Sequence, residues 1–126
     1  MVLVDTSVWI RGLAGQPAYK PELDRLINLE QVAGHDLVYG ELLAGDRGGR
    51  ARLLSRYELM HQARVVRHAE VVAFVRGRNL YGLGLGWTEL HLLASALVDR
   101  FQLWTADARF AAVAAKFGIA HKAPVR

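Results

Sequence analysis

Four acidic residues have types and positions that could support metal-dependent chemistry. Each is expected where a strand ends or on the apolar face of a helix, and they are Asp5, Glu41, Glu89 and Asp107. A carboxylate held in apolar surroundings is costly unless a cation or hydrogen bonds compensate it. Four such positions in one short chain therefore indicate a shared cation. Ligands that are all oxygen favour Mg²⁺ or Mn²⁺.

Two of these acids are expected directly after a strand and before a helix. Asp5 follows the apolar run at residues 2–4, and Asp107 follows the alternating run at residues 101–105. The carboxyl ends of parallel strands are where ligands gather in open α/β sheets, so both acids are candidates for one site. Aspartate is also among the best helix N-cap residues, and a plain capping role is the alternative for each.

Glu41 is expected on a helix among apolar neighbours. The residues three and four positions away from it are all apolar or small, namely Leu37, Val38, Ala44 and Gly45. A surface glutamate would normally have polar neighbours, so this pattern indicates a buried face. The alternative is a residue at the helix edge whose carboxylate extends into solvent.

Glu89 is expected in the first turn of a helix that starts near Trp87. Its helical face includes Leu85, Gly86, Leu92 and Leu93. The glycines before it would let backbone or substrate approach closely. They do not form a dinucleotide-binding fingerprint, because its last spacing is missing and they do not follow the first strand. The alternative is a glutamate stabilised by the helix dipole.

The pattern of apolar residues predicts short strands that alternate with helices. Strands are expected at residues 2–4, 101–105 and 118–121, and helices at about 8–12, 21–27, 35–44, 51–60, 68–80, 87–98 and 108–117. Such an order indicates a parallel sheet with helices on its faces. In such a sheet the ends of the strands open onto one edge, to which neighbouring helices can also bring Glu41 and Glu89.

Composition limits the classes of protein to which the chain can belong. With 126 residues, 52% of them hydrophobic, it has the size of one domain, spanning residues 1–126. The absence of cysteine excludes disulfides and thiolate zinc sites. The charge at Asp5 comes too early for a signal peptide, and no apolar stretch could cross a bilayer. We therefore expect a soluble, cytoplasmic protein with no membrane role.

The remaining histidine and tryptophan residues are interpreted as structural. The five histidines form no pair at helical spacing and are expected at the surface or in packing contacts, at positions 35, 61, 68, 91 and 121. Trp9, Trp87 and Trp104 are expected in the core.

Basic residues are mostly arginine and are unevenly distributed. Thirteen of the sixteen are arginine, the formal net charge is +4, and the surplus is densest between Arg47 and Arg78. The planar guanidinium of arginine can donate two parallel hydrogen bonds to one phosphate. If these side chains lined one rim they would attract a polyanion. The alternative is an ordinary solvated helix surface.

Several motifs, taken in order, resemble those of the PIN-domain ribonucleases, and among them the VapC toxins of bacterial toxin-antitoxin pairs. These motifs are Val2-Leu3-Val4-Asp5-Thr6-Ser7-Val8-Trp9-Ile10, Glu41-Leu42-Leu43-Ala44-Gly45, the segment 84–97, and Leu103-Trp104-Thr105-Ala106-Asp107. The resemblance covers essentially the whole chain. It implies a PIN-like three-layer α/β fold in which helices flank a short, mainly parallel sheet.

The resemblance also implies a function and a set of site residues. The four acids would form the catalytic and metal-binding site, with Ser7 and Thr105 as polar supports. The protein would be an endoribonuclease toxin dependent on Mg²⁺ (or Mn²⁺), a homodimer, and inhibited by a cognate VapB antitoxin that covers the acidic cleft. One departure is Glu89, where the family usually has aspartate. Its side chain is longer by about 1.5 Å, so we expect a shifted or weakened metal position with retained activity.

Other classes of protein fit the sequence less well. A receiver-like Mg²⁺-binding signalling domain needs a pair of acids after the first strand and a late lysine, and neither is evident. A haloacid-dehalogenase-type phosphatase needs a second aspartate where the chain has Ser7. A catalytically inactive RNA-binding PIN module is the remaining alternative, and it would bind RNA without cleaving it.

Overall fold

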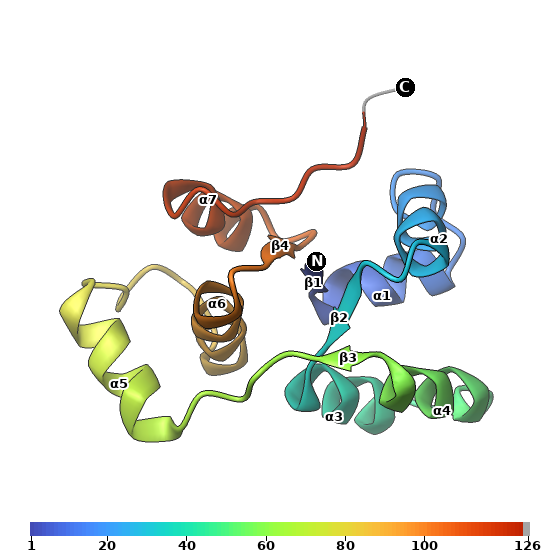
Figure 1. Cartoon of the computed structure of the whole chain (residues 1–126), viewed down its shortest axis with the longest axis horizontal. Coiled ribbons are helices and arrows are strands. Elements are labelled where there is room, and N and C mark those ends of the chain that lie inside the picture. Colours follow the sequence, from blue (N-terminus) through green and yellow to red (C-terminus); the bar gives the residue numbers. More distant parts are fainter. Residues whose placement is uncertain (125–126) are drawn as a thin grey trace.

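The sheet of this protein is short, parallel and four-stranded, and it lies between layers of helices (Figure 1). The computed structural model describes residues 1–124. The strands are β1 (Val2–Val4), β2 (Val32–Gly34), β3 (His61–Gln62) and β4 (Gln102–Trp104). Their order is β3-β2-β1-β4, and each described pair is parallel. The predicted α/β class with a parallel sheet is confirmed.

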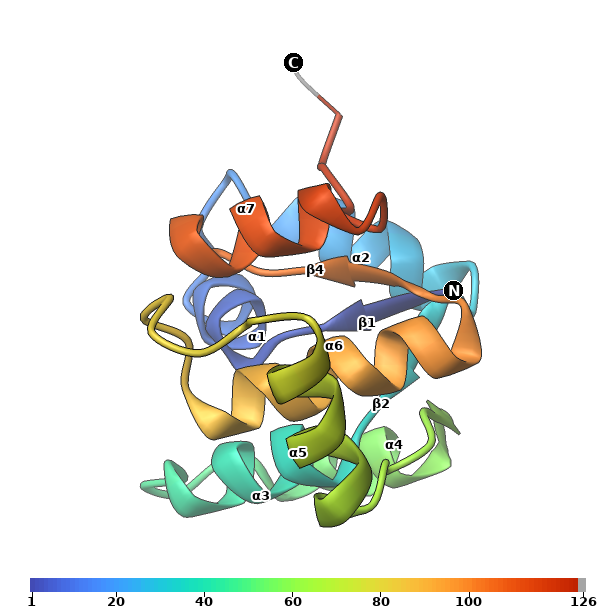
Figure 2. The same cartoon turned by 90° about the vertical axis from the view of Figure 1, so that its left-hand side faces the viewer.

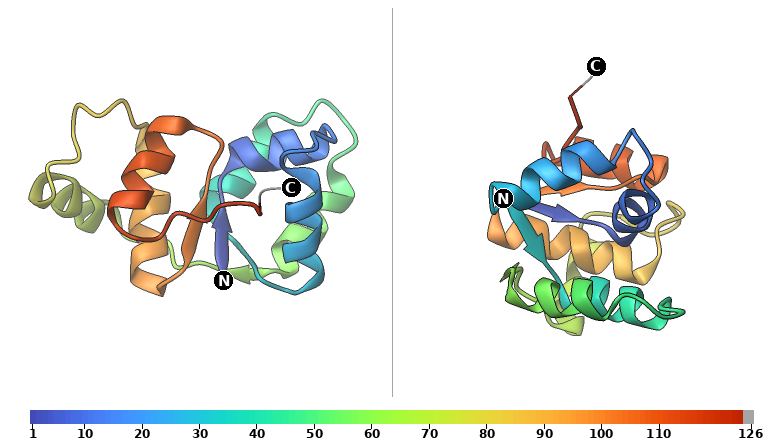
Figure 3. Two further views of the ribbon diagram at one scale, coloured as in Figure 1. Left: turned by 90° about the horizontal axis from the view of Figure 1, so that it is seen from above. Right: turned by 90° about the vertical axis from the view of Figure 1, so that its right-hand side faces the viewer.

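Seven helices are found within residues 1–124. They are α1 (Thr6–Leu13), α2 (Lys20–Asn28), α3 (Asp36–Ala44), α4 (Ala51–Leu59), α5 (His68–Gly77), α6 (Trp87–Asp99) and α7 (Ala108–Lys116). Each overlaps a helix predicted from the sequence. Seen from above, α5 and α6 lie on one side of β1, and α1 and α2 lie on the other (Figure 3). None of these helices combines the length and apolar character needed to cross a bilayer.

Two strands of the sheet were not predicted. β2 has three residues and β3 has two, which is too short for a pattern of alternating side chains to show. Conversely, the strand predicted at residues 118–121 is only an isolated bridge between Leu103 and Ala120. The backbone N–H of Leu103 donates to Ile119 O at 2.8 Å, so this segment still covers the open side of β4.

The core is built around the central strand β1. All three of its residues are buried, as expected for a parallel strand covered on both faces. Trp9 and Trp104 are also buried, as predicted. The prediction for Trp87 was wrong, because 42% of this residue is exposed. It is the first residue of α6, where the helix surface is not yet covered by the core.

The arginines between Arg47 and Arg78 do not line one rim. Figure 1 places α4 and α5, two helices of this segment, at opposite sides of the molecule. Some of the arginines also have local partners. Arg50 Nη1 donates to Leu42 O at 2.8 Å, and Arg67 Nη2 donates to Glu70 Oε1 at 2.9 Å. The arginine surplus therefore forms no single patch that by itself indicates a polyanion.

The fold brings the start of several helices to one edge of the sheet. β1 and β4 are direct neighbours in register, with Val4 opposite Trp104. Figure 2 shows the two strands side by side, with α6 and α7 beginning near the edge at which the strands end. Because α1 follows β1 after one residue, its start lies at the same edge.

Candidate functional site

Asp5 lies between β1 and α1 and is buried, with 6% of its surface exposed. Its backbone has the N-cap position of α1, but its side chain makes no capping hydrogen bond. Instead, Oδ2 accepts hydrogen bonds from Ser7 Oγ at 2.7 Å and from Thr105 Oγ1 at 2.8 Å. The carboxylate is thus oriented by two hydroxyls rather than used to cap the helix.

The hydroxyls of Ser7 and Thr105 are themselves held by the backbone. Ala106 N donates to Ser7 Oγ at 3.0 Å, and Asp107 N donates to Thr105 Oγ1 at 3.1 Å. Since each hydroxyl oxygen already accepts a hydrogen bond, its own proton is available for Asp5. This network joins the start of α1 to the end of β4 and brings together both residues expected to act as polar supports.

Glu41 lies on an exposed part of α3, so the prediction of a buried apolar face was wrong. The argument failed because α3 also turns apolar residues to solvent, among them Leu43, which is 53% exposed. Glu41 Oε1 accepts a hydrogen bond of 2.6 Å from Thr6 Oγ1. Thr6 was not identified as a site residue from the sequence. The only available signal was its position next to Asp5.

Glu89 is half-buried in the first turn of α6. Its Oε1 accepts a hydrogen bond from Gly86 N at 2.8 Å. The pKa of Glu89 is raised, first by burial and then by the nearby carboxylates of Asp107, Asp5 and Glu41, while the Gly86 N–H opposes the shift. All three carboxylates are thus near enough to affect the ionisation of Glu89.

Asp107 is the N-cap of α7, as its position after a strand predicted. Its Oδ1 accepts from Phe110 N at 2.9 Å, and the residue is exposed. The capping role does not remove Asp107 from the acidic group, because its charge is among those that raise the pKa of Glu89.

The four carboxylates share a pattern of hydrogen bonding. In each, one oxygen accepts from a neutral donor, namely a hydroxyl for Asp5 and Glu41 and a backbone N–H for Glu89 and Asp107. Within residues 1–124 the second oxygen of each has no protein donor. None of the ion pairs in this part of the chain involves these acids, because the paired ones are Glu22, Asp24, Glu70 and Asp99. Four negative charges are therefore oriented but not neutralised by basic side chains.

The donor set fits a hydrated hard cation better than a fully enclosed one. In the described part of the chain, no three side chains of histidine, aspartate or glutamate are close enough to bind one ion together. Mg²⁺ commonly keeps several waters and takes only one or two carboxylates directly. The available donors are all oxygen and the chain has no cysteine, so they suit Mg²⁺ or Mn²⁺ held partly through water.

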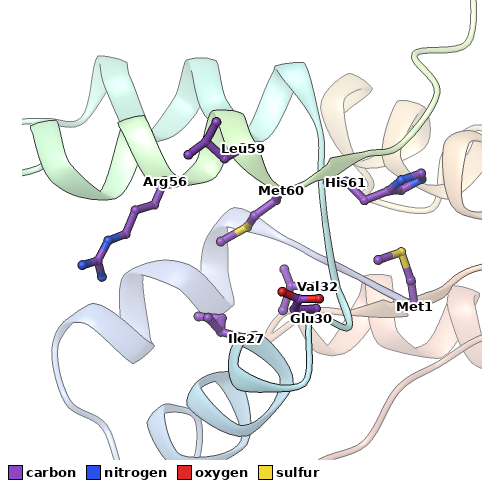
Figure 4. Close-up of a pocket in the computed structure, with 8 residues that line it drawn as sticks. All are labelled: Met1, Ile27, Glu30, Val32, Arg56, Leu59, Met60 and His61. Atoms are coloured by element: carbon purple, nitrogen blue, oxygen red, sulfur yellow. The ribbon is translucent and has the colours of Figure 1, made fainter.

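A cavity of the molecule lies away from these acids (Figure 4). It has a volume of about 490 Å³ and is lined by Met1, Ile27, Glu30, Val32, Arg56, Leu59, Met60 and His61. Met1, Val32 and His61 lie where β1, β2 and β3 begin, which is the opposite edge of the sheet. None of the four acids lines this cavity.

The sheet order, the helices on its faces and the acids at the carboxyl edge agree with a known class of α/β domain. The family model for the PIN domain matches residues 2–116. The chain therefore belongs to the PIN domain family.

Two curated relatives make the placement within the family more specific. Both are named Ribonuclease VapC32, from Mycobacterium tuberculosis strains ATCC 25618 / H37Rv and CDC 1551 / Oshkosh. Each is 40% identical over 121 residues, which cover 95% of this chain and 95% of the relative. The resemblance to PIN domains of the VapC type, inferred from the motifs, is confirmed.

Proposed function

We propose that this protein is a Mg²⁺-dependent endoribonuclease toxin that hydrolyses RNA phosphodiester bonds. The main support is its 40% identity, over nearly the whole chain, to a protein named as a ribonuclease. In this proposal Glu89 and the three other oriented acids would provide the chemistry that such an activity needs. In this proposal the protein acts in the cytoplasm as a homodimer, and a cognate VapB antitoxin inhibits it.

The proposed metal ligands are the four acids of the site. Asp5, Glu41, Glu89 and Asp107 would hold Mg²⁺ or Mn²⁺ with their free oxygens, partly through water. When bound, the ion supplies an activated water and compensates the negative charge that develops on the phosphate oxygens. Hydrolysis forms one new bond from phosphorus to the water oxygen and breaks one ester bond.

The residues around the acids limit how far the carboxylates can turn. Ser7 and Thr105 fix Asp5 from two elements, and Thr6 fixes Glu41 across the start of α1. All of these donors are uncharged, so they orient the acids without competing for the positive charge of an ion. Arg109 follows Asp107 by two residues and lies against Gly84. In this proposal its guanidinium would bind RNA phosphates beside the site.

Replacement of Asp5 by Asn tests the catalytic assignment. The change keeps the shape of the side chain but removes its charge, so Mg²⁺-dependent cleavage of RNA should be abolished while circular dichroism shows an unchanged fold. Cleavage at the parent rate would show that Asp5 is not part of the site. A parent protein that binds RNA but does not cleave it with Mg²⁺ or Mn²⁺ would instead support the inactive RNA-binding alternative.

Expression in cells tests the toxin assignment. An acidic site without basic partners could accept an arginine of an antitoxin in place of the metal. The chain expressed alone should arrest growth, and co-expression of the product of a neighbouring gene should restore it. Harmless expression of a cleavage-competent protein would contradict the toxin role and leave the nuclease assignment intact.

A further inference from the structure

A buried histidine joins two helices that carry acids of the site. His35 lies at the junction of β2 and α3 and is fully buried, as are Ser95 on α6 and Tyr57 on α4. Nε2 of His35 is 2.9 Å from Ser95 Oγ. The backbone N–H of His35 donates to Tyr57 Oη at 2.8 Å. One residue thus connects the sheet with three helices, and none of its hydrogen bonds within residues 1–124 is to an acid of the site.

The contacts of His35 fix the position of its proton. The backbone N–H of Leu37 donates to Nδ1 at 3.0 Å, so this nitrogen accepts and carries no proton. In the neutral ring the proton is then on Nε2, which donates to Ser95 Oγ. The imidazole therefore caps α3 with one nitrogen and binds α6 with the other.

Each of the two residues in the His35–Ser95 contact lies six residues along the chain from an acid of the site. Glu41 follows His35 by six residues on α3, and Glu89 precedes Ser95 by six residues on α6. Six helical residues correspond to about 9 Å along a helix axis. A change in the contact between α3 and α6 would therefore shift both carboxylates, because only a short helical segment separates each of them from this contact.

We propose that the hydrogen bond from His35 Nε2 to Ser95 Oγ is a positioning contact that holds α3 against α6 and so sets the separation of Glu41 and Glu89. His35 and Ser95 are positioning residues, because neither touches the ion or the RNA. This inference rests on the proposed function, since the separation of the two acids matters only if they hold one ion together.

Binding of Mn²⁺, measured by calorimetry, tests the proposal without relying on activity. In Ser95→Ala the acceptor is lost. In His35→Asn the side chain can still cap α3 but cannot reach Ser95. Each variant should bind Mn²⁺ about tenfold more weakly, which lies within the range found when a contact that couples two distant parts of a protein is lost. The double variant should bind no more weakly than either single variant, because both changes remove the same contact.

A destabilised control separates positioning from stability. Leu26 is a buried residue of α2, a helix that carries no acid of the site, and Leu26→Ala should lower thermal stability at least as much as Ser95→Ala. It should bind Mn²⁺ like the parent. For His35→Asn and Ser95→Ala, the rate of RNA cleavage should recover to that of the parent at high Mn²⁺ concentration.

Two results would overturn the inference while leaving the nuclease intact. One is a folded Ser95→Ala or His35→Asn protein with the Mn²⁺ affinity of the parent. The other is an equal loss of Mn²⁺ affinity in Leu26→Ala. A parent protein that neither binds Mn²⁺ nor cleaves RNA would overturn the proposed function itself, and with it this inference.

Discussion

At the level of single residues, the four acids of the site share one kind of hydrogen-bond donor, which is a neutral one. Four of the eight acids outside the site have basic partners, as Glu22 does in Arg25, whose guanidinium is the main cause of its lowered pKa. The acids of the site have only hydroxyls and backbone N–H groups. Neutral donors fix the direction of a carboxylate but leave most of its charge available. Four such carboxylates at one edge of the sheet are a physical reason to expect a cation among them.

Thr6 is the residue whose role can be tested most directly. Thr6→Val keeps the shape of the side chain but removes the hydroxyl that donates to Glu41. Because a hydrogen bond to a charged group at a partly solvated position contributes about 1 kcal/mol, RNA cleavage should fall by roughly fivefold. The cleavage rate at limiting Mg²⁺ measures this effect. Thr6→Ser is the matched control, since it keeps the hydroxyl and should retain parent activity. Equal rates for Thr6→Val and the parent would show that this bond has no part in catalysis.

At the level of secondary-structure elements, Asp107 combines two functions that substitutions can separate. Its side chain caps α7, and its charge belongs to the acidic group. Asp107→Ser keeps a capping hydroxyl and should change stability little, whereas Asp107→Ala removes the cap and should cost about 1 kcal/mol. Both should lose Mg²⁺-dependent cleavage, because both lose the carboxylate.

Urea unfolding and RNA cleavage, measured on both Asp107 variants, check this separation. If Asp107→Ser kept full RNA cleavage activity, Asp107 would contribute to activity by capping α7 and not by binding metal. If Asp107→Ala were as stable as the parent, the hydrogen bond to Phe110 would have no stabilising role.

The elements also show what could be predicted from the sequence. Helices of eight or more residues and strand β1 were predicted because their own side chains carry a clear pattern. β2 and β3 were missed because they are defined by their neighbours, as in the hydrogen bond of 2.7 Å from Ala63 N to Gly34 O. The acids after β1 and β4 were placed correctly by the same reasoning that identified those strands.

Side-chain environments were predicted less well than elements. Glu41 was expected on a buried face, but α3 is apolar on several faces, so apolar neighbours did not indicate burial. Trp87 was expected in the core although the end of α6 leaves it exposed. Contacts between distant segments, such as those of Thr6 with Glu41 and of His35 with Ser95, left no pattern in one sequence.

At the level of the whole molecule, the burial of His35 links stability to pH. Burial lowers the pKa of His35 to about 4, helped by His91 and opposed by Asp36, whereas its ordinary value is 6.5. The unfolded chain therefore binds a proton at a pH at which the folded protein does not. The contribution of His35 to the free energy of unfolding should be fully present above pH 6.5 and should be lost as the pH decreases towards 4. The difference between the two pKa values corresponds to about 3 kcal/mol.

Urea unfolding between pH 7.5 and 4 measures this dependence. Other groups also titrate in this range, so the comparison is with His35→Asn, in which the side chain has no proton to gain. The free energy of unfolding of His35→Asn should decline less steeply below pH 6.5 than that of the parent. Parallel declines for the two proteins would show that His35 does not contribute to the acid sensitivity.

Binding of a metal should also appear as a change in the stability of the whole molecule. The free oxygens of the four acids repel one another, and an ion that binds only the folded protein stabilises it by an amount that grows with its concentration. At ten times the dissociation constant the gain is about 1.4 kcal/mol, or roughly 3–8 °C in the melting temperature of a domain of this size. Scanning calorimetry with Mg²⁺ or Mn²⁺, and then with excess EDTA, measures the shift and its reversal.

Two variants show whether the ions bind at the site. Asp5→Asn should show little shift in melting temperature. Asp24→Asn, which removes an exposed acid that pairs with Lys20 outside the site, should keep the full shift. Equal shifts in these two variants would mean that the ions bind elsewhere on the surface and that the four acids form no metal site.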